Sequence, residues 1–525
     1  MDHPPVLENQ ASTAVPKANE YERKVRILNE AMQEIGMGRY QWALFFVTGF
    51  GYFADNLWPI VTGLILPAVV NEFKFNAPFV KLGQNIGLLV GAVFWGVGAD
   101  VWGRKLSFNA TLLITGVFAV SAGGSQNYAT LSALAAAWSV GVGGNLPVDS
   151  AIFLEFVPAT HQYLLSVLSI WWSLGQLIGS LIAWPLLTRF SCPTPTSTSI
   201  SCRPEANKGW RYFLFIMGAL MLLLWAIRFF AFEMHESPKY LLGKGKEAQA
   251  VEVVKRVARV NGKTCSLVLE DLLSRGVAKE GREGKVEAFV GDAEKVVEVV
   301  EKAVKEGKAG GGGGSVMAGL DFTHVKALFA TKEEARSTCL LVALWALIGL
   351  AFPLYNSFVT YFLSTRGVQF GDGSTYTTYR NQVILSTLGV PGSIISGYVV
   401  ELPVLGRRGT LAIFTALTGV FILGSTTART SNALLGWNSA YSFTSNVMYG
   451  VLYAITPELF STKDRGTGNA LTAAANRVFG VMAPIIALYA DLSTSVPIYI
   501  SGSIFLVCGI LALLLPKETR GKAAL

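Results

Sequence analysis

The chain has 525 residues, of which 51% are hydrophobic and only 15% are charged. Soluble domains carry about 25% charged residues, so this composition excludes an ordinary soluble protein and indicates a membrane protein. The formal charge of +8 could suggest nucleic acid, but the basic excess lies beside apolar segments, where it indicates membrane topology and contact with anionic lipids. We therefore expect contacts with the lipid bilayer and no nucleic-acid partner.

Twelve segments are apolar over the roughly 20 residues that a helix needs to cross a bilayer. Six of them precede and six follow a polar central region. In chain order they are residues 41–70, 82–101, 107–126, 129–157, 162–188, 211–232, 338–363, 380–402, 408–427, 432–457, 467–490 and 495–515. The pattern predicts an all-α membrane protein with 12 transmembrane helices.

These spans divide the chain into an N-terminal arm (1–40), an N-terminal bundle (41–232), a central loop (233–337), a C-terminal bundle (338–515) and a tail (516–525). An even number of spans places both termini on one side of the membrane. Lys and Arg residues near the span ends are more numerous on that side, so the arm, loop and tail are expected to be cytoplasmic. The polar arm has no apolar stretch behind a basic start, so we expect no cleavable signal peptide.

The central loop contains two distinct sequence patterns. Segments such as EAQAVEVVKRVARV (247–260) carry apolar residues at helical spacing between charges, which predicts soluble helices. The glycine run Gly310–Gly314 predicts a flexible tether. We expect solvated helices that join the two bundles; the alternative is a regulatory platform.

Cysteine and histidine usage bears on metal and redox chemistry. Five cysteines show no spacing typical of metal ligands, and none of the four histidines is paired at helical spacing. We therefore expect no metal, no cofactor and no enzymatic activity. Cys192 and Cys202 bracket a loop rich in Pro, Ser and Thr, and they could form a disulfide if that loop faces an oxidising compartment.

Two motifs recur six spans apart. GVGADVWGRK (96–105) ends the second span, and GYVVELPVLGRR (397–408) ends the eighth with two extra residues before its Gly-Arg pair. LEFVPATHQ (154–162) ends the fourth span, and PELFSTKDRGTG (457–468) ends the tenth. A duplicated six-helix unit predicts two pseudo-symmetric six-helix bundles, the arrangement of carriers that alternate access between two halves.

The first of these motifs resembles the cytoplasmic signature of the major facilitator superfamily. HESPKYLL (235–242) and the later PKETRGK are similar to motifs of its sugar-porter section, where His235 and Lys239 replace Pro and Arg. GGNLPVDSAIFLEFVP (143–158) and PELFSTKDRGTGNALTAAANRVFGVMAP (457–484) resemble the branch that holds synaptic-vesicle glycoproteins and nicotinate-type carriers, in a form familiar from fungal proteins. The resemblance implies the twelve-helix fold of this superfamily.

A carboxylate at the end of one helix, followed by a tight turn and a guanidinium, can bind a neighbouring helix end and hold one conformation closed. We expect Asp100 and Arg104 to form such a latch, as the resemblance also implies. The alternative is a basic loop that only sets topology. The expected latch residues are Gly96, Asp100, Gly103, Arg104, Lys105, Glu155, Glu401, Arg407, Arg408, Glu458 and Arg465.

Three ionisable residues lie deeper in the predicted spans: Asp55, Asp149 and Arg477. A charge at this depth costs about 2.5–3.5 kcal/mol on insertion scales, so it must face a bundle interior, a partner or a water-filled path. Because the resemblance implies that spans one, four, seven and ten line the cavity, Asp55 and Asp149 are expected to face the solute. They could carry a proton or capture a cationic group. Asp149 could instead only lock helix packing through Ser150 or Asn145.

Arg477 could hold a carboxylate or phosphate, or it could simply neutralise an acidic partner. The amides and aromatic residues expected beside the deep charges are Asn56, Gln176, Tyr355, Asn356, Asn446 and Tyr449. Such a lining suits a small polar organic solute, although each aromatic residue could alternatively pack or anchor the protein at the membrane interface. The resemblance favours Gln176, because sugar porters carry a substrate-facing Gln in span five.

From the sequence we expect the chain to be a secondary active carrier of a small polar organic solute, such as a sugar, an organic ion or a vitamin-like compound, coupled to protons. A facilitative sugar-type uniporter and a transporter-like sensor that signals through the central loop are the alternatives. We expect a monomer in the plasma membrane, in preference to a vacuolar or other internal membrane.

Overall fold

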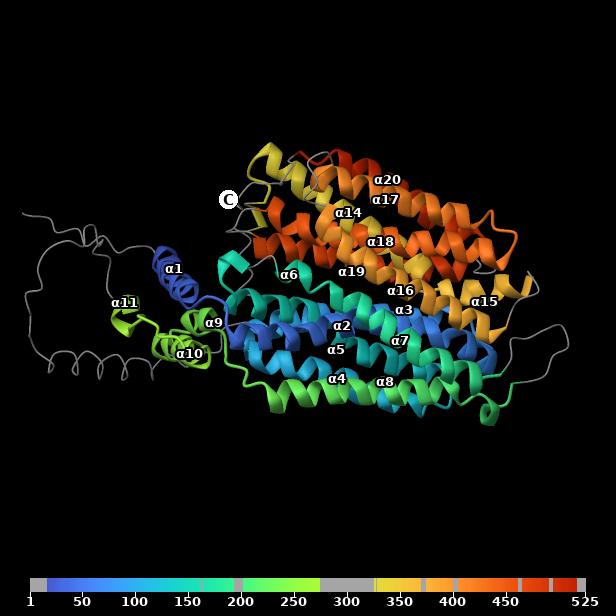
Figure 1. Ribbon diagram of the computed structural model, residues 1–525, viewed down its shortest axis with the longest axis horizontal. Coiled ribbons are helices and arrows are strands. Elements are labelled where there is room, and N and C mark those ends of the chain that lie inside the picture. The colour runs from blue at the N-terminus through green and yellow to red at the C-terminus, as the bar shows by residue number, and fades with distance from the viewer. Residues whose placement is uncertain are drawn as a thin grey trace, which may run out of the picture.

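The computed structural model describes residues 17–161, 164–192, 202–273, 325–326, 328–369, 374–399, 405–460, 465–490 and 494–516. Glu401, the Gly310–Gly314 tether and residues 517–525 lie outside these ranges, and the side chains of Asp100 and Arg465 are not described either. In Figure 1 the chain forms a long helical body with a smaller group of helices at one end.

The first half of the body contains six long helices. They are α2 (Arg39–Phe73), α3 (Pro78–Trp102), α4 (Arg104–Gly123), α5 (Tyr128–Phe156), α7 (Ile170–Arg189) and α8 (Gly209–Ala226), which continues into the π-helical turn η3 (Ile227–Ala231). Short elements connect them: η1 (Ala159–His161), α6 (Leu164–Val167) and η2 (Pro204–Ala206).

The second half repeats this arrangement. Its helices are α14 (Lys332–Asn356), continued by α15 (Val359–Gln369), then α16 (Thr375–Val399), α17 (Gly406–Ser425), α18 (Ser431–Leu459), α19 (Arg465–Tyr489) and α20 (Val496–Leu513). Equivalent helices also begin alike. Asn127 caps α5 by accepting from the Thr130 backbone N–H, and Thr430 caps α18 by accepting from that of Ala433.

Eleven of the described helices are long and apolar enough to cross a membrane. Helix α18, the tenth predicted span, has 29 residues and so has the length, but its hydropathy is lower. Its polar residues include Asn438, which is buried inside the second half, and Asn446, which faces the space between the halves. Polarity toward the bundle interior lowers the hydropathy of a helix without exposing polar groups to lipid.

The helix pairings follow a pseudo-twofold relation. Helix α3 packs on α5, α4 on α5 and α8, and α2 on α7; correspondingly α16 packs on α18, α17 on α18 and α20, and α14 on α19. The contacts between the halves obey the same relation, because α3 packs on α19 where α16 packs on α7. The predicted pair of pseudo-symmetric six-helix bundles is therefore present.

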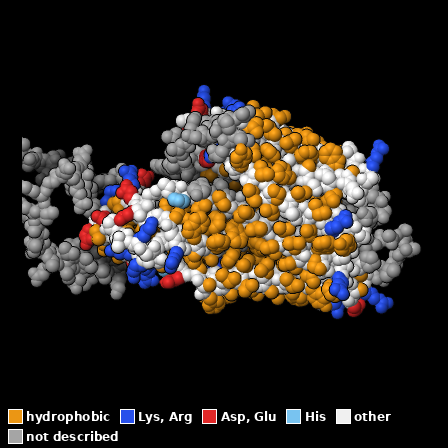
Figure 2. Space-filling model, in the orientation of Figure 1, with side chains coloured by type: hydrophobic (Ala, Val, Ile, Leu, Met, Phe, Trp, Pro, Cys, Tyr) orange, Lys and Arg blue, Asp and Glu red, His pale blue; other side chains and the backbone are white. Residues whose placement is uncertain are grey.

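Figure 2 shows hydrophobic side chains over the flank of the body and charged side chains gathered toward its ends. We call these the α9 end, which carries the smaller group of helices, and the disulfide end, where Cys192 and Cys202 are joined. An apolar belt between two polar ends is the surface expected of a protein that spans a bilayer.

The smaller group of helices consists of α1 (Lys17–Ile35), α9 (Pro238–Gly243), α10 (Glu247–Val260) and α11 (Leu269–Leu273). Helix α1 buries Leu28 and Met32 in one cluster with Val254 and Val257 of α10. Arg23 also donates to the backbone carbonyl of Leu272 at 2.8 Å. The helix predicted over residues 247–260 is present as α10, and its apolar face is covered by that of α1.

Candidate solute site

A cavity with a volume of about 130 Å³ lies between the two halves. Its walls come from α2, α3 and α7 on one side and from α14, α18 and α19 on the other. Seven of the residues predicted to bind solute or protons line it: Asp55, Asn56, Gln176, Asn356, Asn446, Tyr449 and Arg477. Helices far apart in the sequence thus bring these side chains to one place.

Asp55 of α2 and Arg477 of α19 form an ion pair across the cavity. The Arg477 Nη2 atom donates to Asp55 Oδ1 at 2.7 Å, and the two side chains are only 17% and 12% exposed. Because the partners belong to different halves, this pair both neutralises two charges at depth and ties the halves together. Removing the charge of either partner would leave the other charge unpaired at depth and would remove this link between the halves.

Aromatic rings form another part of the cavity wall. Trp172 lies against Tyr453 across the boundary between the halves, with ring centroids 4.4 Å apart. Phe352 meets Tyr449 edge to face at 4.9 Å. Asn85 and Asn476 also line the cavity and were not among the residues predicted from the sequence. Both are amides inside predicted spans, which is the signal that would have found them.

Asp149 does not face the cavity, so that expectation is wrong. Its side chain is fully buried within the first half, where the Arg228 Nη2 atom donates to Asp149 Oδ2 at 2.8 Å. Arg228 also donates to the backbone carbonyls of Val47 and Phe108, both at 2.7 Å. The proposed Ser150 partner instead shares a hydrogen bond with the hydroxyl of Tyr52 at 2.7 Å. The hydrogen bonds of Arg228 therefore link four helical segments around Asp149.

Arg228 was overlooked in the sequence, although it is a cation inside the predicted span 211–232. Tyr355 is the second residue that the structure removes from the cavity wall. Its side chain is buried inside the second half, and its hydroxyl donates to Asn438 Oδ1 at 2.5 Å. The hydrogen bond to α18 holds Tyr355 in the core of that half, behind the neighbouring cavity residue Asn356.

Matching ion pairs stand at the α9 end of each half. Arg104, at the start of α4, pairs with Glu155, near the end of α5. Arg407, at the start of α17, pairs with Glu458, near the end of α18. The two pairs occupy equivalent helix ends, so the repeated sequence motifs correspond to a repeated contact.

Glu236 of the HESPKYLL motif joins the first of these sites. Its carboxylate accepts from the backbone N–H groups of Arg104 at 3.0 Å and Lys105 at 3.4 Å. Gly103 precedes them with φ at +103°, a conformation that favours glycine. The motif after the sixth span therefore caps the start of α4, which sequence reasoning did not foresee.

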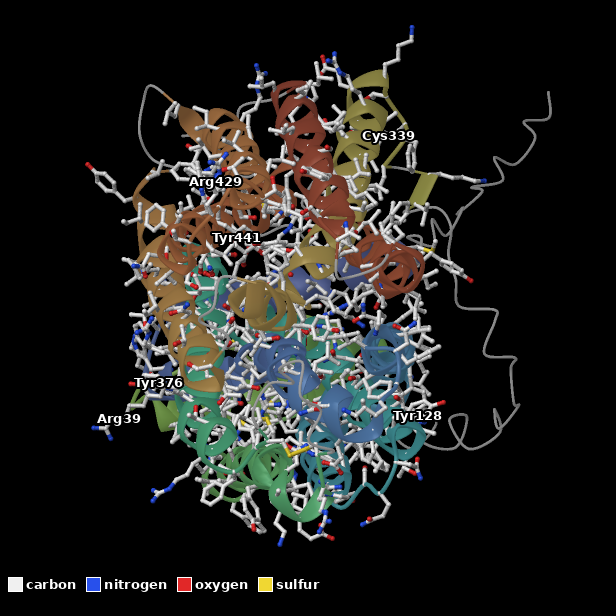
Figure 3. The ribbon with its side chains drawn as sticks, turned by 90° about the vertical axis from the view of Figure 1, so that its right-hand side faces the viewer. Arg39, Tyr128, Cys339, Tyr376, Arg429 and Tyr441 are labelled. Carbon is white, nitrogen blue, oxygen red and sulfur yellow. A yellow bond between two sulfur atoms is a disulfide. The ribbon has the colours of Figure 1, made fainter. Side chains whose placement is uncertain are left out.

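The halves pack tightly at the disulfide end. Leu66 of α2 shares a buried apolar cluster with Leu354 of α14 and Ala483 of α19. The hydroxyl of Tyr379 in α16 donates to the backbone carbonyl of Leu64 at 2.9 Å. Figure 3 looks along the body from this end and places Tyr376, which contacts Trp184, at the boundary between the halves. The cavity is therefore sealed toward the disulfide end.

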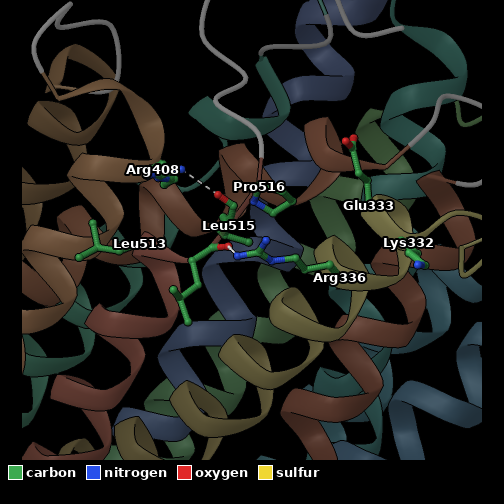
Figure 4. Close-up of a pocket in the computed structure, with 8 residues that line it drawn as sticks. Lys332, Glu333, Arg336, Arg408, Leu513, Leu515 and Pro516 are labelled. Carbon is green, nitrogen blue, oxygen red and sulfur yellow. Dashed lines mark hydrogen bonds between the residues drawn. The ribbon is translucent and has the colours of Figure 1, made fainter.

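A wider hollow of about 570 Å³ lies at the α9 end of the second half, where α14 and α17 begin and α20 ends (Figure 4). Arg336 donates to the Leu514 carbonyl at 3.1 Å, and Arg408 donates to the Leu515 carbonyl at 2.9 Å. Both arginines thus cap the last turn of α20, where cations are favoured. We do not assign the solute site there, because the hollow lies at the rim and not between the halves.

The sequence matches the family described as "Sugar (and other) transporter" over residues 82–522, which is most of the chain. The chain belongs to this transporter family. The transporter is 53% identical to "MFS siderochrome iron transporter 1" of Ceriporiopsis subvermispora, over 100% of this chain and 95% of that one. It is 24% identical to "Niacin transporter NiaP" of Acinetobacter baylyi, over 87% and 88% of the two chains.

The fold of the transporter is that of the xylose transporter XylE from E. coli, with a TM-score of 0.65 at 14% identity over 92% of this chain and 99% of XylE. These likenesses confirm the predicted twelve-helix fold of the major facilitator superfamily and its sugar-porter-like character. The relatives and the fold are those of transporters and not of enzymes. The protein is therefore an integral multi-pass membrane transporter of a small solute.

Proposed function

We propose that this transporter carries a small polar organic solute together with protons by alternating access. The Asp55–Arg477 ion pair is the observation that supports this, because it lines the cavity and joins the two halves. A proton on Asp55 would remove the attraction that holds Arg477, so the guanidinium would become available to a carboxylate or another acceptor on the solute. The same event would loosen the contact between the halves.

The cavity dimensions favour a small solute. Sites for drug-sized ligands have volumes of about 300–1,000 Å³, whereas this cavity has about 130 Å³. A single-ring compound, such as the niacin named for the Acinetobacter relative, suits that space, and Trp172, Tyr449 and Tyr453 offer aromatic faces to it.

A ferric siderophore is the second candidate, favoured by the name of the relative that is 53% identical over this whole chain. Such a chelate is several times larger than the cavity and would need a wider conformation. Sugars remain a further candidate by family, with a facilitative uniporter as the mechanism.

The ends of the body fit specific roles. We propose that the α9 end is cytoplasmic, because it carries the basic signature motifs, and that the Cys192–Cys202 end faces an oxidising compartment. We assign the bundles to residues 41–232 and 338–515, and we place a monomer in the plasma membrane. The Arg104–Glu155 and Arg407–Glu458 pairs, with their motif neighbours, would act as the conformational latch.

The test begins with a thermal-shift screen of the purified full chain against sugars, organic acids, vitamins, amines and a ferric siderophore. Uptake of the stabilising compound into liposomes is then measured with and without an inward proton gradient. We expect the gradient to raise uptake several-fold, and we expect Asp55→Asn to abolish this gain. Glu30→Gln, on the exposed face of α1, is the matched charge-removing control and should behave as wild type.

Each alternative gives a different result in the same assay. Uptake that ignores the gradient in wild type would indicate a uniporter, and binding without uptake would indicate a sensor. Stabilisation by the siderophore alone would support the second candidate. Gradient-driven uptake that survives in Asp55→Asn would overturn the assigned role of Asp55.

A further inference from the structure

One cation at the boundary between the halves has no acidic partner in the part of the chain that the structure describes. The Lys81 side chain of α3 is 1% exposed, and its Nζ atom donates to the Pro59 carbonyl and, at 3.2 Å, to Gln84 Oε1. No carboxylate among the described residues forms an ion pair with it. Burial of a cation without a counter-ion is unfavourable, so the sealed conformation holds this amine at a cost in free energy.

The group around Lys81 has more donors than acceptors. Gln84 is also 1% exposed, and its Nε2 amide group has no hydrogen-bond partner. The Lys81 amine has three N–H bonds and the Gln84 amide has two, whereas two acceptors are in reach. A ligand that satisfies these donors must accept several hydrogen bonds and carry negative charge. A carboxylate has both properties.

Lys81 lies on the same face of α3 as the cavity wall. Lys81, Asn85 and Leu88 follow one another at i, i+4 and i+7, and the last two line the cavity. Pro59, whose carbonyl accepts from Lys81, lines it as well. Pro59 is four residues beyond Asp55 on α2, about 6 Å along the helix toward the disulfide end.

The contact that separates Lys81 from the disulfide end is a close one between the halves. A Cβ atom placed on Gly63 of α2 would lie 3.8 Å from Lys81 Nζ and 3.0 Å from the carbonyl oxygen of Ser357, the residue that follows α14. The amine therefore lies next to the contact of α2 and α3 with the second half. If the halves part at this end, the α3 face that includes Lys81 becomes continuous with the cavity.

We propose that Lys81 is a solute-binding residue of the conformation open at the disulfide end, and that the solute is a small organic anion whose carboxylate it receives. This inference rests on the proposed function and names its substrate class. With the seal open, the described residues of the pathway include two cations, Lys81 and Arg477, and one carboxylate, Asp55. A cationic solute would be repelled from such an entrance, and an anion would be drawn in.

To test the ligand class, we measure how tightly the purified wild-type protein binds carboxylates and the amides that share the same ring. The first pair is nicotinate and nicotinamide. We expect a carboxylate to bind more tightly than its amide. Lys81→Gln should weaken carboxylate binding about tenfold, the loss of one charge-assisted hydrogen bond, and leave amide binding unchanged. Lys81→Arg should restore most of the affinity, and Lys74→Gln, an exposed lysine at the end of α2, should have no effect.

Opening at the disulfide end is tested without any solute. Lys81→Cys is made in a chain whose free cysteines, Cys265, Cys339 and Cys508, are replaced by alanine, and cells are treated with a membrane-impermeant thiol reagent. Lys81→Cys should react, and Leu112→Cys, which is fully buried within the first half, should not.

Three binding and labelling outcomes would each overturn the inference. The first is a Lys81→Cys chain that is as unreactive as Leu112→Cys. The second is a wild-type protein that binds no carboxylate of the panel better than its amide. The third is a folded Lys81→Gln protein that binds carboxylates as wild type does. Proton-coupled transport of a neutral or cationic solute would refute this inference and leave the proposed function intact.

Discussion

At the scale of single residues, two aspartates on neighbouring helices have different environments. Asp55 is paired with Arg477 beside the cavity, where solute and water can compete for either partner. Asp149 is enclosed with Arg228, whose guanidinium also lies 3.7 Å from the centroid of the Phe108 ring. Under the proposed function the first pair opens during transport, whereas the second holds helices of the first half together.

Asp149→Asn should therefore act on stability. It leaves Arg228 buried with its charge uncompensated, which typically costs about 3–5 kcal/mol of unfolding free energy. The double variant Asp149→Leu/Arg228→Met should recover much of this loss. Thermal unfolding of the purified proteins measures both effects. A stable Asp149→Asn protein that has lost only proton coupling would restore the role that the sequence suggested.

Gly51 permits the close approach of Asp149 to α2. A Cβ atom at Gly51 would lie 1.7 Å from Asp149 Oδ2, so alanine cannot be accepted without displacement of the Asp149–Arg228 pair. Gly51→Ala should lower stability by more than the 1–3 kcal/mol typical of overpacking. Gly436→Ala in α18, where a Cβ meets nothing within 4 Å, is the matched control and should be neutral or stabilising. Equal melting temperatures for the two variants would contradict this packing.

At the scale of elements, the segment before α9 links the smaller helices to the body. His235 is mostly buried and stacks on Tyr40 of α2, with ring centroids 5.7 Å apart and planes at 6°. Burial lowers the pKa of His235 below its ordinary 6.5; Glu233 and Glu252 act in the opposite direction, and Arg256 and Lys105 add to the lowering. The neutral ring is therefore the form that the folded protein prefers.

This preference predicts a loss of stability in acid. Because the lowered pKa makes the folded protein bind fewer protons than the unfolded chain, the contribution of His235 is complete above about pH 6.5 and is lost as the pH falls through the lowered pKa. The melting temperature should drop by a few degrees from this source between pH 7.5 and 5. His235→Phe keeps the ring stack and should reduce the drop, and His161→Gln should not. An unchanged pH profile in His235→Phe would refute the assignment.

At the scale of the whole molecule, the pseudo-twofold relation extends from helix pairing to individual ion pairs. Arg104–Glu155 and Arg407–Glu458 each join the start of one helix to the end of the next in equivalent positions. Both pairs lie at the α9 end, whereas the apolar seal between the halves lies at the disulfide end. Each pair lies within one half, so under the proposed alternating access each bundle would move as a rigid body.

Charge reversal tests these pairs as a latch. Arg407→Glu places two carboxylates together and should slow transport several-fold, because the second half loses the contact between the start of α17 and the end of α18. Arg407→Glu/Glu458→Arg should recover most of the rate. Uptake by the single and double variants in liposomes measures the coupling. Additive losses in the double variant would show that the pair does not act as a unit.

The sequence by itself determined the membrane class, the spans, the duplicated halves and the transporter family, because hydropathy and repeated motifs are properties of local stretches of chain. It also indicated seven residues of the cavity wall, since amides and charges inside apolar spans are conspicuous. Only the tertiary structure decided which charges meet. Asp149 pairs with a residue 79 positions away and Asp55 with one 422 positions away, and neither partner follows from local spacing. Helix rotation within each half, set by packing over the whole body, sends Asp55 to the cavity and Asp149 into the core.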